Sequence, residues 1–425
     1  MNNRKTISII TFLLIFISVE GFAQFSLSGE IRPRSEYSHG YGSLAGIDQK
    51  PSLFTSQRAR LNFFYKSDKI ETKLVIQDVR IWGNQKQLVG NEDFATSIHE
   101  AWGEVFFNSD LSLRVGRQEL IYDDHRIFGN VGWAQQARSH DLALFKYKGD
   151  FTLHLGIAYH ENSNRKNNIY DGPDAYKTMQ FVWFNRNFNE LKLSVLFLNN
   201  GTPFVEETDN GGNVIKESIK FSQTFGPRVI YQLGDLNLSG NFYVQTGRDR
   251  ADNSLSAFEF AVDGVYKLSS DLSLFAGYEM LSGTAYDEEA GKNKSFTPFY
   301  GTNHKFNGFM DYFYVGNHIN NVGLNDIHFG AKYSWTKVFV QGKFLVFSSA
   351  APINADVNNY LGTELDFWMG YKVGKEIKLG AGYSHLFASE SMQVLKGGDK
   401  SATQNWMYVM LSFTPKFFTT KKAAE

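Results

Sequence analysis

The chain has 425 residues, a formal net charge of −1 and no cysteine, which excludes a disulfide framework and a lipoprotein anchor. Aromatic residues make up 16% of it, with 38 Phe, 21 Tyr and 38 Gly against only 8 Pro. The mean hydropathy is −0.32, and no apolar run after residue 23 is long enough for a membrane helix. If such a chain crosses a membrane, it must do so as a closed sheet, because lipid cannot satisfy open backbone groups.

Residues 1–23 have the pattern of a targeting segment. A positively charged start precedes an apolar core at 7–19, and small residues stand at Gly21 and Ala23, the two positions that a signal peptidase reads. The apolar core is short for a permanent membrane helix. We therefore predict a signal peptide at 1–23 and a mature chain, residues 24–425, that leaves the cytoplasm.

The mature chain is built from short segments in which apolar and polar side chains alternate. Between Phe151 and Tyr159 every second residue is apolar, and the stretch from Leu236 to Val244 repeats the pattern. A period of two predicts a strand with one apolar and one polar face. About eighteen such strands are predicted, beginning near Phe25, Leu53, Ile70, Ile98, Leu111, Ser139, Phe151, Tyr176, Leu191, Lys220, Leu236, Ala257, Leu272, Ile327, Val338, Leu361, Ile377 and Gln404.

The connections between these strands are of two kinds that alternate without a break. The short turns lie at 66–69, 108–110, 148–150, 187–190, 233–235, 268–271, 334–337 and 373–376. The long polar links lie at 38–52, 83–97, 123–137, 161–175, 200–219, 247–255, 283–325, 349–360 and 389–402. Such alternation is typical of a barrel with short periplasmic turns and long extracellular loops. We predict an all-β, transmembrane, antiparallel β-barrel in the outer membrane of a Gram-negative bacterium.

The C-terminal end completes this organisation. The last predicted strand, from Asn405 to Phe413, is rich in aromatic residues, and residues 415–425 form a basic tail that we expect in the periplasm. We find no internal repeat at a solenoid or propeller period, and no second domain, linker or plug. Residues 24–425 are therefore predicted to be one barrel, monomeric, with lipid and lipopolysaccharide around it.

Charged side chains fall on one face of the first strands. Arg32 and Arg34 lie opposite Ile31, and Arg58 and Arg60 lie opposite Leu61. Guanidinium groups need water, carboxylates or an anionic ligand, and rings of arginine select anions in pores. The predicted lumen path consists of Arg32, Arg34, Arg58, Arg60, Arg80, Arg114, Arg117, Arg126 and Arg138. Glu30, Glu100 and Glu104 are predicted to lie beside them and to weaken their attraction for anions. Alternatively, each arginine has only a structural role and stabilises the barrel wall through an ion pair. The acids available for such pairs are Glu30, Glu36, Asp78, Glu100, Glu104 and Asp141.

Several blocks of this sequence resemble the alginate-export family of outer-membrane barrels. The match covers nearly the whole mature chain and is densest in its first third. Its blocks are 28–37, 54–70, 76–83, 99–107 (HEAWGEVFF), 114–130 (RVGRQELIYDDHRIFGN), 133–147, 299–313 (FYGTNHKFNGFMDYF) and 323–333. The resemblance implies an eighteen-stranded barrel whose lumen passes an anionic uronic-acid polymer and carries a strongly electropositive constriction.

The resulting functional hypothesis is a non-catalytic channel for an alginate-like polysaccharide or its oligomers. Periplasmic export machinery is a possible partner, and no nucleic acid is expected. One alternative is an anion-selective porin for small organic acids or phosphate. Another is an adhesion barrel that acts through long loops, above all 283–325, whose aromatic stretch 296–314 either gates the pore, stacks on sugars or packs on neighbouring segments.

Enzymatic and metal-dependent functions find little support in the sequence. Asp123, Asp124 and His125 are adjacent in a predicted loop and point in different directions, and His99, His140 and His304 are not at ligand spacings. Glu364 and Asp366 share a strand face, as a hydrolase would want. A wetted lumen explains this pair equally well. No catalytic residue, metal or cofactor is predicted.

Overall fold

The computed structural model describes residues 23–87, 96–160, 176–318 and 320–420, and within these ranges the fold is almost entirely β-sheet. The strands are β1 (Gln24–His39), β2 (Ser52–Lys66), β3 (Ile70–Ile81), β4 (Thr96–Phe106), β5 (Leu111–Gln118), β6 (His140–Lys148), β7 (Thr152–Tyr159), β8 (Thr178–Phe188), β9 (Leu191–Thr208), β10 (Val214–Leu233), β11 (Leu236–Arg248), β12 (Ser254–Lys267), β13 (Leu272–Leu281), β14 (Lys292–Asn293), β15 (Leu324–Trp335), β16 (Val338–Ser348), β17 (Tyr360–Lys372), β18 (Ile377–Ala388), β19 (Asn405–Phe413) and β20 (Lys416–Thr419). Three short helices lie between them, η1 (Asn303–Lys305), α2 (Val315–His318) and α3 (Glu390–Lys396).

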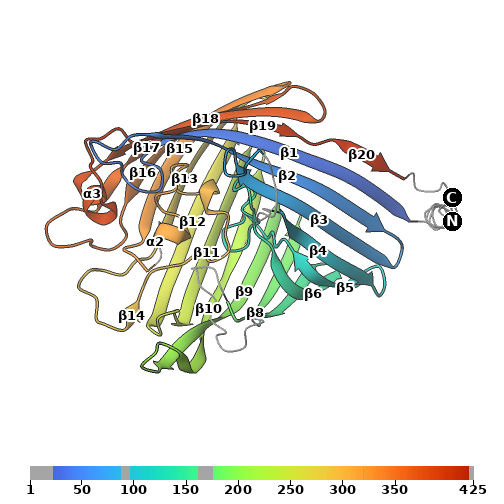
Figure 1. Cartoon of the computed structure of the whole chain (residues 1–425), viewed down its shortest axis with the longest axis horizontal. Coiled ribbons are helices and arrows are strands. Elements are labelled where there is room, and N and C mark those ends of the chain that lie inside the picture. Colours follow the sequence, from blue (N-terminus) through green and yellow to red (C-terminus); the bar gives the residue numbers. More distant parts are fainter. Residues whose placement is uncertain (1–22, 88–95, 161–175, 319, 421–425) are drawn as a thin grey trace.

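All strands except the short β14 and β20 form the wall of a closed antiparallel barrel, which makes eighteen wall strands (Figure 1). Each wall strand pairs with its neighbour along the chain, and β1 closes the ring by pairing with β19, with Tyr37 opposite Met407. The predicted fold class is confirmed. This is the architecture of an outer-membrane protein of a Gram-negative bacterium.

The two ends of the barrel differ in their connections. Turns of a few residues, such as that between β2 and β3, gather at the end where β1 begins and β19 ends, and the long connections gather at the other (Figure 1). We call these the short-turn end and the long-loop end. In barrels of this kind the short turns face the periplasm, and this orientation stays a prediction here.

The outer face of the wall carries the apolar set of the alternating pattern. In β7, the Ile157 side chain is 58% exposed on the outside, whereas Ala158 beside it is 2% exposed and faces the interior. The other outward apolar side chains include Ile31, Leu61, Val115, Phe225, Phe329, Phe367 and Val409, all of them exposed. Such a ring of exposed apolar side chains fits contact with lipid. No helix in the described ranges is long and apolar enough to cross a bilayer.

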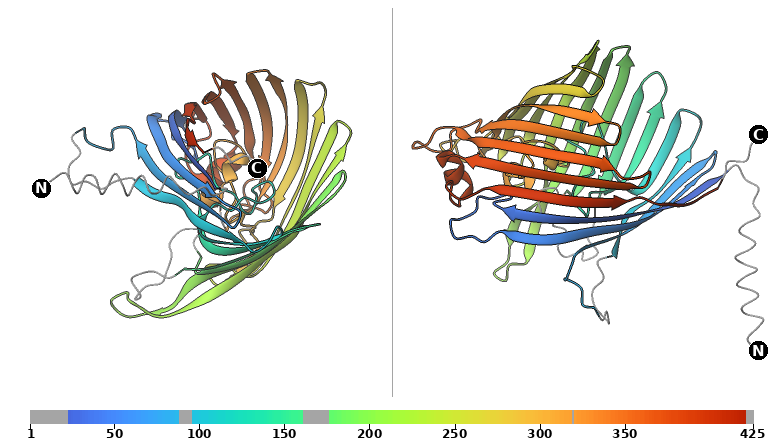
Figure 2. Two further views of the ribbon diagram at one scale, coloured as in Figure 1. Left: turned by 90° about the vertical axis from the view of Figure 1, so that its right-hand side faces the viewer. Right: turned by 90° about the horizontal axis from the view of Figure 1, so that it is seen from above.

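Two long connections fold back into the barrel and fill its interior (Figure 2). Inner loop A, residues 119–139, joins β5 to β6, and inner loop B, residues 282–323, joins β13 to β15. In inner loop B the side chains of Tyr300 and Tyr312 are 1% and 0% exposed. Burying large aromatic groups of this kind is favourable by roughly 1.5–3 kcal/mol each. The loop folds inward, as the gate alternative expected, and packs on neighbouring segments, as the structural alternative expected; gating itself stays a prediction.

Two segments differ from the sequence-based expectation or extend it. The predicted link 200–219 is largely strand, because β9 and β10 continue as a hairpin that turns at 209–213, where Gly212 has a φ of +81°. Within the predicted tail, β20 pairs with the start of β1, where Leu27 lies opposite Phe418. Almost all of the predicted signal peptide lies outside the described residues.

Candidate functional site

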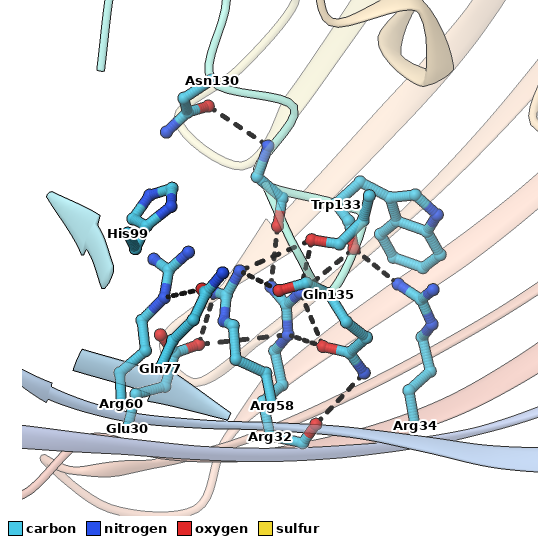
Figure 3. A network of polar contacts seen from close by, with 12 residues as sticks. Glu30, Arg32, Arg34, Arg58, Arg60, Gln77, His99, Asn130, Trp133 and Gln135 are labelled. Carbon is cyan, nitrogen blue, oxygen red and sulfur yellow. Dashed lines mark hydrogen bonds and ion pairs between the residues drawn. The ribbon is translucent and has the colours of Figure 1, made fainter. Parts of the chain in front are cut away.

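Three arginines gather on the lumen face where β1 meets β2, and we call Arg32, Arg58 and Arg60 the arginine cluster (Figure 3). Register places Arg32 directly opposite Arg58, an arrangement in which like charges repel. One carboxylate offsets this repulsion. Oε1 of Glu30 lies 2.7 Å from Nη2 of Arg58 and 3.9 Å from Nε of Arg32. Two of the three guanidinium groups therefore share one acidic partner.

Backbone carbonyls of inner loop A accept many of the hydrogen bonds that the guanidinium groups of the arginines do not donate to Glu30. Arg32 donates to the carbonyl oxygens of residues 132–134 at 2.8, 3.1 and 3.2 Å. Arg34, one step further along β1, donates to the carbonyl of Trp133 at 2.7 Å, and its guanidinium carbon lies 4.1 Å from a Trp133 ring centroid. This is cation–π distance. The arginines therefore hold inner loop A against the wall.

Not every donor of the cluster is used. Nε of Arg60 donates to Oε1 of Gln77 at 3.0 Å, but Nη2 of Arg60 and Nε of Arg58 are buried without a hydrogen-bond partner. An unpaired buried donor is costly, above all on a charged group. The cluster thus keeps an unfilled capacity for an anion, and guanidinium matches the geometry of a carboxylate.

Inner loops A and B interlock at the centre of the lumen. Phe128 stacks on Tyr300 with ring centroids 5.6 Å apart, and the backbone of Gly129 donates to the carbonyl of Tyr300 at 2.8 Å. Trp133 stacks on His304 at 4.5 Å. Inner loop A contacts the arginine cluster on β1 and β2, and in inner loop B the backbone N–H of Thr297 donates to Gln245 of β11, on the far side of the ring, at 2.9 Å. The two loops together therefore form a constriction.

Two buried acids on β17, three strands from β1 around the ring, hold inner loop B on the wall. Glu364 and Asp366, both 0% exposed on β17, accept hydrogen bonds from the backbone N–H groups of Met310 at 2.9 Å and Phe309 at 3.3 Å. A Cβ on Gly308, whose φ is +88°, would lie 2.5 Å from Oε2 of Glu364. The pair is an anchor for the loop, a role that neither interpretation of the sequence included.

Three more of the predicted arginines point inward and have partners in the wall or the loops. Arg114 lies 2.6 Å from Glu104, which also accepts from Lys146 at 2.8 Å. Arg126 lies 2.8 Å from Glu279, and Arg138 donates to the carbonyl of residue 301 at 3.2 Å. Arg114 therefore pairs with Glu104, one of the acids that the alternative named, whereas Arg126 pairs with Glu279, which it did not name.

The prediction of a lumen position was wrong for two residues. Arg80 lies opposite Gln57 on the outer face and pairs with Asp78 at 2.6 Å. Arg117 lies opposite Asp141 and pairs with it at 2.9 Å, with 41% of its side chain exposed. Successive residues of a strand face opposite sides of the sheet. In β5 the Arg114 side chain faces the lumen, so Arg117, three residues later, faces outward. Neither Arg80 nor Arg117 touches the lumen path.

Near β4 and β5, the fold brings together three polar residues that the sequence did not indicate as a group. Ligand atoms of His99, Glu100 and Glu119 lie within 4.8 Å of one another. Their hydrogen-bonding capacity is already engaged, because His99 bonds to Glu119 at 2.7 Å and Glu100 accepts from Trp102 at 3.0 Å and pairs with Lys73. Burial opposes ionisation of Glu119, but the hydrogen bond from His99 still holds its pKa below the usual value. The group works as a hydrogen-bonded support for inner loop A.

The remaining lumen space includes a cavity of about 580 Å³ beside inner loop B. Lys305, Phe306 and Phe309 line it from the loop, and β10 to β17 line it from the wall. Acidic and basic side chains are both present, among them Asp263 and His328, which are 3.0 Å apart. A volume of this size is in the range of small-molecule sites.

Comparisons with known proteins place the fold but not the family. No family model matches the chain, and no curated protein matches it. Among solved structures it is similar to OccAB4 of Acinetobacter baumannii, with a TM-score of 0.61 and 12% identity over 92% of this chain and 98% of that one. It is also similar to Pseudomonas aeruginosa OccK9 (OpdG), with a TM-score of 0.60 and 12% identity over 94% of this chain and 100% of that one. For OccK11 (OpdR) of the same organism the TM-score is 0.58, with 12% identity over 93% of this chain and 96% of that one.

At such identities the likeness shows an eighteen-stranded outer-membrane barrel and nothing finer. The resemblance to the alginate-export family is supported only to this extent, as membership of the broad class of outer-membrane barrels.

Proposed function

We propose that this protein is a non-catalytic outer-membrane channel that favours small organic anions. The observation that carries the proposal is the arginine cluster, in which Arg32 and Arg58 share the carboxylate of Glu30 and two buried N–H groups have no partner. Arginines lining a narrow aqueous path select anions, and a path must bind its solute weakly enough to release it.

The filled lumen supports a small solute over a long polymer. Inner loops A and B meet inside the barrel. The lumen contains a cavity of about 580 Å³ beside inner loop B and one of about 530 Å³ toward the short-turn end. These volumes suit single small molecules. Passage of an acidic polysaccharide, the function implied by the alginate-export resemblance, would need both loops to move aside.

Liposome swelling with the purified full-length barrel tests the proposal. Small organic anions such as acetate and succinate should enter faster than neutral solutes of equal size, and uronate chains of about ten units should not enter. Equal rates for anionic and neutral solutes would refute the anion preference. Entry of the long uronate chains would replace the proposal with polysaccharide transport.

A further inference from the structure

The lumen holds a second cationic site, far from the arginine cluster in sequence. A cavity of about 530 Å³ lies between β15 and β19 toward the short-turn end. Lys332, Lys337, Lys372 and Lys378 are among its lining residues, and no Asp or Glu lines it. The larger cavity beside inner loop B has acidic lining residues as well as basic ones. The smaller cavity, which we call the lysine pocket, is therefore distinct in its charge.

The lysines of this pocket are not neutralised by the protein. Lys372 and Lys378 are direct register partners on β17 and β18, so two ammonium groups stand side by side on one face. In the described ranges no salt bridge involves Lys332, Lys372 or Lys378. The acid closest in sequence is Glu376, in the turn between these two strands, and its carboxylate accepts from the backbone of Lys416 at 3.1 Å. The local repulsion is left for a bound anion to relieve.

The walls of the pocket favour a ring. Phe339, Trp368 and Tyr408 line it, and Nζ of Lys332 lies 5.1 Å from the Phe339 ring centroid. Gly380 leaves space on the wall, since the closest atom to a Cβ built there would be Cε of Met410 at 3.6 Å. Apolar and aromatic surface next to several point charges is suited to a flat ligand with charged substituents.

Barrel closure brings this pocket next to β1. Gly380 pairs with Met410 of β19, and Met410 pairs with Arg34 of β1. The lysine pocket, which Met410 lines, therefore lies next to Arg34 of β1, although the two are about three hundred residues apart in the chain.

From these features we propose that the lysine pocket binds organic anions that carry two or more negative charges on a ring. Several ammonium groups match more than one anionic group, the aromatic side chains cover the faces of the ring, and the volume admits one small molecule. The inference goes beyond the proposed function, because binding at this pocket does not require that the barrel conduct.

Calorimetric titration of the detergent-solubilised full-length barrel with benzene-1,3,5-tricarboxylate tests the proposal. Citrate keeps three carboxylates without the ring, and benzoate keeps the ring with one carboxylate, so both should bind more weakly. K372Q/K378Q should weaken binding of the tricarboxylate about tenfold, since each exposed ion pair contributes up to about fivefold. Gly380→Leu, which fills the pocket and keeps every lysine, should weaken it as well.

Two controls separate this site from general attraction and from the proposed function. K216Q/K292Q removes two exposed lysines near the long-loop end, with the same change in net charge, and should leave the affinity unchanged. R58Q/R60Q should also leave it within about twofold. Equal weakening by both lysine pairs, full binding to Gly380→Leu, or equal affinity for citrate and the tricarboxylate would overturn the proposal. Each of these results is independent of whether the barrel selects anions.

Discussion

Neutralising two lumen arginines should lower anion selectivity in a salt-dependent way. In R58Q/R60Q, a permeating ion about 8 Å from each former charge loses about 0.5 kcal/mol of interaction per charge in water. At 0.1 M salt, where the Debye length is about 10 Å, screening reduces this to about half. The change acts with opposite sign on anions and cations. The anion-to-cation permeability ratio should therefore fall about fivefold at 0.1 M salt and less than about 1.5-fold at 1 M.

Reversal potentials in planar bilayers under a salt gradient measure this ratio directly. The matched control is R80Q/R117Q, which removes the same charge from the outer face, where Arg80 and Arg117 pair with Asp78 and Asp141. Its ratio should equal that of the unchanged protein. A shift of similar size in the control, no shift in R58Q/R60Q, or a shift that persists at 1 M salt would refute the argument that the arginine cluster lines the conduction path.

Three further predictions concern topology, loop anchoring and pH. A cysteine at Asp68 should resist surface labelling of intact cells and one at Asn210 should label, and the reverse pattern would invert the assigned orientation. Gly308→Ala places a Cβ against a buried carboxylate and should destabilise inner loop B by about 1–2 kcal/mol, seen as more open-channel noise, whereas Gly374→Ala, in open space and without a positive φ, should not. Burial lowers the pKa of His318 to about 3, below an unfolded value of about 6.5, so acidification protonates only the unpacked loop. Between pH 6.5 and 5 inner loop B should lose about 2 kcal/mol, measured by hydrogen exchange, and His318→Gln should abolish that loss.

Local periodicity was enough to predict the wall. A strand exposes alternate residues to lipid and lumen whatever its partner, so each segment of period two could be recognised alone. Seventeen of the eighteen predicted starts lie within three residues of the observed ones, and the exception, Lys220, lies six residues after the start of β10. The same alternation also predicts that Arg117 faces outward, because it has the same parity as Leu113 and Val115 on the outer face of β5. Arg80 likewise shares the phase of Leu74 and Ile76.

The interior of the barrel was decided only by tertiary structure. Inner loop A is positioned by arginines about one hundred residues earlier in the chain, and inner loop B by Glu364 and Asp366, more than fifty residues later. The pairing of β1 with β19 sets Arg34 opposite Met410 and so brings the lysine pocket, which Met410 lines, next to β1. Alternation of side chains fixes which face a residue occupies, but it contains no information on which distant strand that face will meet. That depends on barrel closure, which arises from contacts between segments far apart in sequence.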